Sequence, residues 1–187
     1  MNIMKNGRLE LIIGCMYSGK TTELIRLIER YESIQKKMMI INYKGDTRYG
    51  SDNKIYTHDR RGVDAIHIEN IMNVFTEEFE ERYKTSDIIF INEGQFFNNL
   101  FDFCVRSIEE DDKTVIICGL DGDYKREPFG DILRLIPVSD KITRLTAMCK
   151  ICNDGTPGLF TRRIIDSEKQ ELIGGIESYL PVCRKHY

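Results

Sequence analysis

Short apolar runs alternate with segments of helical apolar spacing between residues 9 and 120. Four runs predict buried strands: residues 9–13, 36–42, 87–92 and 113–120. In three segments apolar residues recur three or four positions apart, which predicts amphipathic helices: residues 24–31, 71–83 and 97–108. Strands separated by helices favour an α/β fold, a parallel sheet with helices on both faces. A ligand binds such a sheet at the carboxyl ends of its strands, so the polar residues there are the first site candidates.

The turn between the first strand and the first helix fits the pattern G-x-x-x-x-G-K-[ST]. It consists of eight residues: Gly14, Cys15, Met16, Tyr17, Ser18, Gly19, Lys20 and Thr21. Inward-turned backbone N–H groups and the positive end of the following helix make an anion site. Lys20 is expected to reach the β- and γ-phosphates, and the Thr21 hydroxyl to bind Mg²⁺. The strand and helix on either side disfavour a chance glycine-rich turn, so we predict a nucleoside triphosphate site.

The third predicted strand ends at Asn92 and is followed by Glu93. A carboxylate at this point would face the phosphates, which makes Glu93 the candidate general base for a reacting hydroxyl. The alternative is an acidic residue that only stabilises a helix N-terminus. Phe96 and Phe97 come shortly after. They cannot point the same way from one helical turn, so one of them can face the pocket.

A polar segment at residues 45–60, after the second predicted strand, contains a cluster of charged residues: Asp46, Arg48, His58, Asp59 and Arg60. An arginine beside a phosphoryl acceptor would stabilise charge in the transition state of phosphoryl transfer. The alternative is a solvated loop without a catalytic role, and the residues of the segment alone favour that alternative.

The C-terminal third contains two pairs of potential metal ligands, each pair with two residues between its members: Cys149 with Cys152, and Cys183 with His186. Three thiolates and an imidazole are a typical set for tetrahedral Zn²⁺, and a closed set of four indicates a structural ion. Coincidence is the alternative. Two consecutive glycines at residues 174–175, between the pairs, mark a loop that can approach a ligand closely.

Composition limits the remaining function classes. The 187 residues are 41% hydrophobic and 30% charged, which suits one main domain with a small appendage. A net charge of −3 and acidic runs at residues 77–81 and 109–112 argue against a general nucleic-acid surface. The chain shows neither an apolar run of membrane-spanning length nor the apolar core of a signal peptide, so a cytoplasmic protein is expected. A rival interpretation stays open, a P-loop ATPase with a zinc ribbon that acts on nucleic acid.

Several short motifs follow one another in a specific order along the chain: GCMYSGKTTELI, DTRY, THDR, NEGQFF, LDGDYKREPFGDIL, RLTAMCKIC, FTRR, IGGIESY and VCRKH. Together they resemble the type II family of thymidine kinases over nearly the full length. The resemblance implies ATP-dependent phosphorylation of thymidine to its 5′-monophosphate in nucleotide salvage, with deoxyuridine as a further candidate substrate. It also implies a P-loop NTPase-like domain at residues 1–140 and a zinc-binding lasso domain at residues 141–187 that closes over the nucleoside.

The resemblance also implies roles for individual residues. Glu93 is the implied general base, with Lys20 and Arg48 acting on the transferred phosphoryl group. The implied ATP contacts are the P-loop and the residues around the end of the third strand: Gly14, Cys15, Met16, Tyr17, Ser18, Gly19, Lys20, Thr21, Asn92, Glu93, Gly94 and Gln95. The implied thymidine contacts come from several segments: Met16, Asp46, Arg48, Phe96, Leu120, Tyr124, Thr161, Gln170, Glu171, Leu172, Ile173, Gly174 and Tyr179.

The implied cofactors are two metal ions. Mg²⁺ would arrive with ATP and contact Thr21, and a structural Zn²⁺ would be held by the four ligands Cys149, Cys152, Cys183 and His186. The implied partners are ATP and thymidine, with dTTP as a feedback inhibitor and a homotetramer as the assembly. Neither a nucleic acid nor a membrane is expected as a partner.

Three residues depart from the pattern of this family. Cys15 stands where a proline is usual, and Tyr124 where most members have phenylalanine, so that a hydroxyl enters or borders the base pocket. Asn92 stands where the family has aspartate, which removes a negative charge near Mg²⁺. We therefore expect a kinase that needs more free Mg²⁺ than its aspartate-bearing relatives. The alternative is a nucleotide-binding protein with impaired catalysis.

Overall fold

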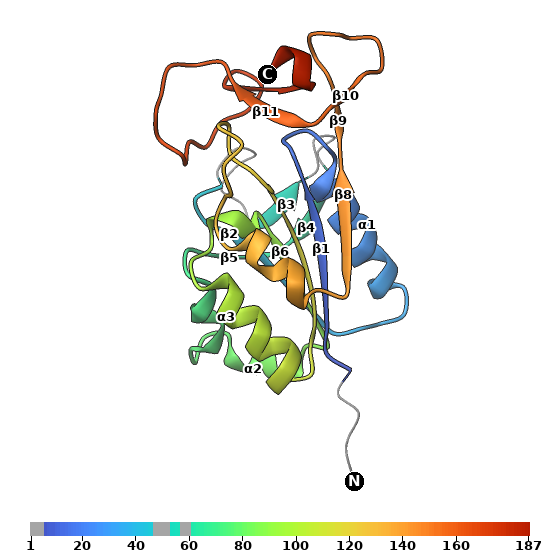
Figure 1. Ribbon diagram of the computed structural model, residues 1–187. Helices are drawn as coiled ribbons and strands as arrows, with labels where there is room; N and C mark the ends of the chain where they lie inside the picture. The colour runs from blue at the N-terminus through green and yellow to red at the C-terminus, as the bar shows by residue number, and fades with distance from the viewer. Residues whose placement is uncertain (1–5, 47–52, 57–60) are drawn as a thin grey trace.

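A six-stranded sheet forms the body of the protein in the computed structural model, which describes residues 6–46, 53–56 and 61–187 (Figure 1). Its strands are β1 (Arg8–Gly14), β2 (Met38–Tyr43), β5 (Ile66–Ile68), β6 (Ile88–Asn92), β7 (Thr114–Gly119) and β8 (Lys141–Leu145). They lie in the order β5-β2-β6-β7-β1-β8, and neighbours run parallel. The four predicted strands are β1, β2, β6 and β7, so the predicted α/β fold is confirmed.

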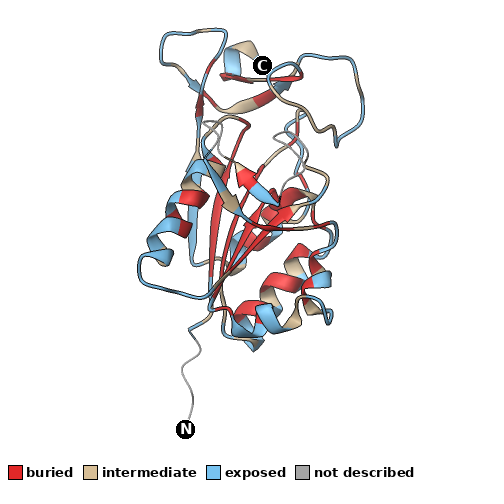
Figure 2. Ribbon diagram, turned by 180° about the vertical axis from the view of Figure 1, so that it is seen from behind, coloured by how far each residue is buried: buried red, intermediate tan, exposed pale blue. Residues whose placement is uncertain are grey.

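The side chains of each strand alternate between the two faces of the sheet, and helices cover both faces. The helix α1 (Lys20–Glu32) packs on one face, where its Leu24 and Ile28 join Ile12 and Phe90 in an apolar cluster. The apolar spacing at residues 24–31 thus turns one side of α1 to the sheet, as predicted. In Figure 2 the central strands of the sheet are largely buried, whereas the outer sides of the helices are exposed.

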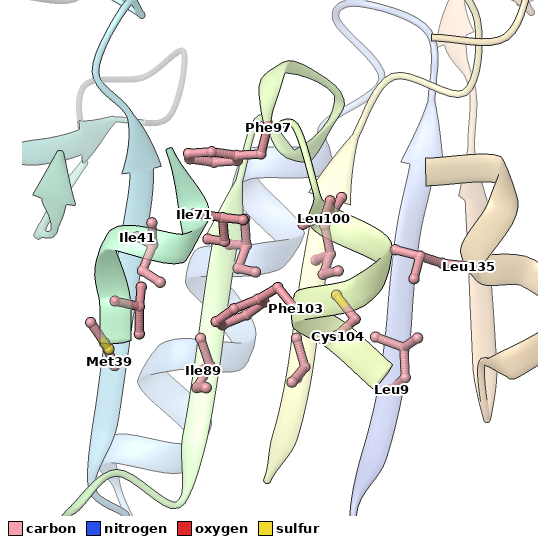
Figure 3. Packing of buried hydrophobic residues seen from close by; sticks show 14 of the residues in the cluster. Leu9, Met39, Ile41, Ile71, Ile89, Phe97, Leu100, Phe103, Cys104 and Leu135 are labelled. Carbon is pink, nitrogen blue, oxygen red and sulfur yellow. The ribbon is translucent and has the colours of Figure 1, made fainter. Parts of the chain in front are cut away.

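The opposite face carries four shorter helical segments: η1 (Ile71–Phe75), α2 (Glu80–Thr85), α3 (Leu100–Val105) and η4 (Ile132–Val138). Figure 3 shows the core that they form with the strands, in which Phe103 and Leu100 of α3 belong to the same cluster as Leu9 and Ile89. This core and the α1 core fix the sheet from both sides.

Two helix predictions differ from the structure. Residues 71–83 do not form one helix, because Thr76 is extended (φ −82°, ψ 162°) and separates η1 from α2. The helix predicted at residues 97–108 begins at Leu100 and continues as a π-helical turn, η3 (Arg106–Glu110). The longest helix is α1 with 13 residues, and no helix within the described ranges has the length and apolar character to cross a membrane.

Two smaller groups of strands complete the fold. β3 (Lys54–Tyr56) pairs with β4 (Gly62–Asp64). Beyond β8, β9 (Ala147–Met148) pairs with β10 (Pro157–Gly158), and β11 (Phe160–Arg163) with β12 (Tyr179–Val182), followed by the 3-10 turn η5 (Arg184–His186). We call residues 146–187 the C-terminal unit. β8 belongs to the main sheet, although it follows the domain boundary expected at residue 140.

The carboxyl ends of the strands meet at one edge of the sheet. The register pairs Asn42 with Asn92 and Ile13 with Gly119, so the ends of β2 and β6, and of β1 and β7, lie side by side. The C-terminal unit lies beyond this edge (Figure 1). A ligand at the carboxyl ends of these strands would therefore lie between the sheet and the C-terminal unit.

Candidate functional site

The P-loop joins β1 to α1 in a conformation that needs its two glycines. Gly14 and Gly19 have φ values of 146° and 86°, which few residues other than glycine adopt. A side chain at position 14 would also collide with the carbonyl oxygen of Leu145 on β8. Lys20 begins α1, is 9% exposed, and donates from Nζ to the carbonyl of Cys15 at 2.7 Å. The loop thus presents its lysine at the edge of the sheet, beside the positive end of a helix.

Asn92 ends β6 in a buried polar network with Thr21. Its Oδ1 accepts from the Thr21 hydroxyl at 3.4 Å and from the Cys118 thiol at 3.0 Å. Its Nδ2 donates to Asn42 Oδ1 at 2.8 Å, across the register pair of β2 and β6. With its Nδ2 turned to Asn42, Asn92 places its amide oxygen toward Thr21. Two oxygen ligands fit a hard cation such as Mg²⁺, and neither of them carries a negative charge.

Glu93 is held by Gln95, two residues further on. Glu93 has a left-handed backbone, with φ 56°, and is 8% exposed. Gln95 donates from Nε2 to Glu93 Oε2 at 2.5 Å and accepts at Oε1 from the backbone N–H of Leu120 at 2.9 Å. Since a backbone N–H only donates, the orientation of the Gln95 amide is set and its NH₂ group faces the carboxylate. One carboxylate oxygen of Glu93 thus accepts from Gln95, which fixes the orientation of the carboxylate.

A cavity of about 580 Å³ connects these groups to an apolar chamber. Lys20, Thr21 and Glu93 line its polar end. The chamber is lined by a cluster of aromatic and aliphatic side chains: Met16, Phe96, Leu120, Tyr124, Phe129 and Tyr179. A largely apolar cavity of this size with a few polar groups at one end is typical of a site for a small organic ligand.

The two adjacent phenylalanines point in different directions. Phe96 lines the cavity, stacks on Tyr43 with ring centroids 5.0 Å apart, and meets Phe129 edge to face at 5.4 Å. Phe97 is 1% exposed and belongs to the core on the α3 face of the sheet (Figure 3). The expectation that one of the pair faces the pocket is confirmed.

A loop between β11 and β12, residues 164–178, closes the cavity on the side of the C-terminal unit, and we call it the roof loop. It contributes four of the expected thymidine contacts to the lining: Gln170, Leu172, Ile173 and Gly174. β11 adds Thr161, whose Oγ1 accepts from the backbone N–H of Met16 at 3.0 Å. The P-loop and the C-terminal unit are thus hydrogen-bonded to each other beside the cavity.

Several expected contacts do not line the cavity: Gly14, Cys15, Ser18, Asp46, Asn92, Gly94 and Glu171. Cys15 instead donates from Sγ to the carbonyl of Gly158 at 3.2 Å, and Glu171 accepts from the Tyr43 hydroxyl at 3.5 Å. Arg48 lies outside the described residues, as do three other members of the polar segment: His58, Asp59 and Arg60.

Asp123, Phe129 and Arg163 are among the lining residues that carry no role in the sequence-based predictions. Each lies within a motif of the family resemblance, LDGDYKREPFGDIL or FTRR. No local periodicity marks these residues, because their place in the cavity depends on segments distant in the chain. The motifs themselves are the signal that could have found them.

The four expected metal ligands come together in the C-terminal unit, with all ligand atoms within 4.8 Å of one another. His186 Nδ1 lies 3.6, 3.2 and 3.4 Å from the sulfurs of Cys149, Cys152 and Cys183. Tetrahedral Zn²⁺ with ordinary bond lengths needs sulfur–nitrogen separations of about 3.5 Å. The cluster therefore fits this ion.

The same cluster favours an ionised thiol. Burial raises the pKa of Cys149, but hydrogen bonds from the backbone of Cys152 and Cys183 and from His186 outweigh burial and lower the pKa to about 5. Burial and the neighbouring sulfurs of Cys149 and Cys183 raise the pKa of Cys152 to about 11. The opposite shifts belong to one coupled set, since the first negative charge makes the next ionisation harder. A divalent cation relieves that repulsion.

Together, the sheet topology, the P-loop and the cavity define a P-loop nucleotide-binding α/β protein with a C-terminal unit that can hold a metal ion. A family model described as thymidine kinase matches residues 7–187. The chain therefore belongs to the thymidine kinase family.

Individual relatives agree with this assignment. "Thymidine kinase a" of Arabidopsis thaliana is 42% identical over 183 residues, which are 97% of this chain and 75% of the relative. A thymidine kinase of Variola virus is 41% identical over 184 residues, 98% of each chain. A solved structure of a DNA replication initiation factor has a TM-score of 0.46 at 13% identity, over 74% of this chain and 40% of that chain. That likeness is too slight to support an inference.

Proposed function

We propose that the protein transfers the γ-phosphoryl group of ATP to the 5′-hydroxyl of thymidine, with deoxyuridine as a further acceptor. The observation that carries the proposal is one shared cavity, lined by Lys20 and Thr21 of the P-loop, by Glu93 and by an apolar chamber. Membership of the thymidine kinase family supports a nucleoside as the occupant of the chamber.

The polar end of the cavity is the proposed ATP site. Lys20 would place its charge on the β- and γ-phosphates, and the N-terminus of α1 adds positive potential. Thr21 and Asn92 are the residues proposed to hold Mg²⁺ through their oxygen atoms or through water. When bound, the ion supplies charge neutralisation on the transferring phosphoryl group.

Glu93 is the proposed base, which takes the proton of the 5′-hydroxyl. The hydrogen bond from Gln95 would fix the orientation of the carboxylate that takes this proton. Arg48 and Asp46 belong to the proposal through the family resemblance alone. Arg48 would add positive charge near the phosphoryl group, as Lys20 does.

The chamber is the proposed site of the thymine base. The ring of Phe96, backed by Tyr43, offers a flat apolar surface to an aromatic ligand. The backbone of residues 170–174 in the roof loop would supply hydrogen bonds to the edge of the base. In this proposal residues 1–140 form the ATP domain and residues 141–187 the lasso domain, held together by Zn²⁺ at Cys149, Cys152, Cys183 and His186.

The remaining parts of the proposal come from the family. They are a role in nucleotide salvage, inhibition by dTTP, a homotetramer and a cytoplasmic location. Inhibition by dTTP fits a cavity that joins a phosphate site to a chamber for thymine, because one triphosphate could occupy both ends.

The proposal is tested by incubating the purified protein with ATP, Mg²⁺ and a panel of nucleosides, and separating the products. Thymidine 5′-monophosphate should form fastest. If no nucleoside is phosphorylated while ATP still binds, the protein is a nucleotide-binding protein with impaired catalysis. If ATP hydrolysis instead accompanies strongly salt-dependent binding of duplex DNA, the nucleic-acid ATPase is the better assignment.

A further inference from the structure

The roof loop is held by three side chains that lie outside it. They are Arg163 at the end of β11, Tyr179 at the start of β12, and Tyr124 from the segment after β7. We call these three residues the clasp. All three also line the cavity. The clasp therefore contacts the roof loop on one side and the proposed nucleoside chamber on the other.

The guanidinium of Arg163 binds neighbouring carbonyl groups of the loop. Its Nη1 donates to the carbonyls of Ser167 at 2.8 Å and Lys169 at 2.5 Å. Its Nη2 donates to the carbonyl of Gln170 at 3.1 Å and to the Tyr179 hydroxyl at 2.8 Å. A planar guanidinium presents its donors in a fixed fork, so these contacts set the direction of the loop backbone as well as its position.

The two tyrosine hydroxyls bind further carbonyls of the same loop. Tyr124 donates to Glu168 at 3.1 Å, and Tyr179 donates to Leu172 at 2.7 Å. The guanidinium of Arg163 lies 3.6 Å above the centre of the Tyr124 ring, a cation–π contact. Five carbonyl groups of the roof loop thus accept hydrogen bonds from three side chains. Both tyrosines in turn contact Arg163.

One side chain of the loop adds an anchor at the same place. Gln170 donates from Nε2 to Asp123 Oδ2 at 2.8 Å. The other oxygen of Asp123 accepts from the backbone N–H groups of Lys125 and Glu127, which fixes the turn that carries Tyr124. The clasp and this anchor therefore act on the same stretch of the loop.

Apart from the clasp and the Gln170 anchor, the roof loop is held by few side-chain contacts, among them Glu171, which accepts from the Tyr43 hydroxyl, and Leu172, which packs against the chamber cluster. Residues 164–178 contain neither helix nor strand in the described structure, and three of their apolar side chains, Ile164, Ile165 and Ile176, are 46%, 42% and 66% exposed. A segment with few buried apolar contacts and exposed hydrogen bonds opens easily. The order of this loop therefore depends on the clasp.

We infer that Arg163, Tyr124 and Tyr179 are positioning residues for nucleoside binding. By fixing the carbonyls of residues 167–172, they hold the backbone of residues 170–174 over the chamber. The hydroxyl of Tyr124 serves the loop and does not act on the base. The nature of the ligand rests on the proposed function, whereas the effect of the clasp on the loop does not.

Two conservative variants and one control test this inference. Arg163→Lys keeps the charge but loses the planar fork, and Tyr124→Phe keeps the ring but loses the hydroxyl. Arg162→Lys is the matched control, since Arg162 donates to the carbonyl of His186 at 3.0 Å and does not line the cavity.

Steady-state kinetics should separate the three variants. We expect KM for thymidine to rise roughly 10- to 100-fold in Arg163→Lys and roughly 3- to 10-fold in Tyr124→Phe, with kcat and KM for ATP within about threefold of wild type. Arg162→Lys should match wild type. An unchanged KM for thymidine in both clasp variants would overturn the inference.

Limited trypsin cleavage provides a readout that needs no activity. Lys169 is exposed in the roof loop, and its carbonyl is one of those held by Arg163. Cleavage after Lys169 should be faster in both clasp variants than in the control, at unchanged melting temperature. Equal rates in all variants contradict the inference. If the wild type phosphorylates no nucleoside, the proposed function fails while the cleavage rates still test the clasp. If Arg163→Lys does not fold, Tyr124→Phe decides.

Discussion

The two sides of the cavity are built in different ways. Three polar residues at the carboxyl edge of the sheet form what we call the floor, each less than a tenth exposed: Lys20, Glu93 and Gln95. The roof loop opposite contains the exposed residues Gln170 and Glu171, and side chains rather than strands hold its backbone. Floor and roof line the same cavity and are stabilised in different ways.

The reason for this difference lies in how each side is stabilised. Lys20 begins α1, and Glu93 and Gln95 follow β6; two close-packed cores hold these elements, so displacing one of the floor residues disturbs the sheet. Each hydrogen bond of the roof contributes only about 0.5–1.5 kcal/mol, so a few of them can open together. Proton and phosphoryl transfer need fixed groups, whereas a ligand must enter and leave. Under the proposed function, the floor would supply the fixed groups and the roof would open for the ligand.

Removal of the proposed base should have the largest effect and act on the floor alone. Glu93→Gln should lower turnover by roughly two to four decades while ATP still binds, because the amide cannot take the proton. Glu23→Gln on the exposed side of α1 is the control and should leave turnover unchanged. Turnover of Glu93→Gln within a few-fold of wild type would exclude the base role.

Removal of zinc should damage the roof and spare the floor. Chelation, or Cys183→Ala, should lower the melting temperature and weaken thymidine binding by roughly 10- to 100-fold, because Cys183 directly follows β12, which ends the roof loop. ATP affinity should change less. Cys104→Ala in the α3 core is the control, since it should lower stability without changing the metal content. Purified protein that lacks stoichiometric zinc would contradict the metal assignment.

Substitutions of Gln95 should show how contact with residue 95 affects Glu93. Gln95→Leu removes the hydrogen bond that aims Glu93 and should lower kcat roughly tenfold. Gln95→Glu places a second carboxylate beside Glu93, and repulsion raises the pKa of such a pair. Since the base must be deprotonated, the rise of kcat/KM with pH should move to higher pH in Gln95→Glu. Superimposable pH profiles of the wild type and Gln95→Glu would argue against contact between residue 95 and the base.

The smallest expected effect concerns Asn92, where a charge can be restored without changing shape. Asn92→Asp should lower the free Mg²⁺ concentration for half-maximal thymidine phosphorylation by a few-fold, because a carboxylate attracts the cation more strongly. The amide of Asn42 can turn to donate to the new carboxylate. Mg²⁺ should also raise the melting temperature of Asn92→Asp more than that of the wild type. Identical midpoints would show that residue 92 does not affect the metal.

More of the floor than of the roof could be predicted from the sequence. The P-loop, the four central strands and Glu93 were predictable because motif spacing and apolar runs are local. β8 was missed, since all five of its residues are exposed or half-buried and no apolar run marks it. Pairing with β1 places this strand in the sheet. The four-ligand cluster was predictable from spacing, as its geometry confirms.

Contacts between distant residues needed the folded chain. The hydroxyl of Tyr124 was expected in or beside the base pocket, and it binds the carbonyl of Glu168, 44 residues away. Asn42, which accepts from Asn92, and Leu120, which donates to Gln95, likewise lie in or directly after other strands. A local pattern states which side chains are buried or charged. The direction of each hydrogen bond depends on the packing of segments far apart in the chain, and that packing exists only after folding.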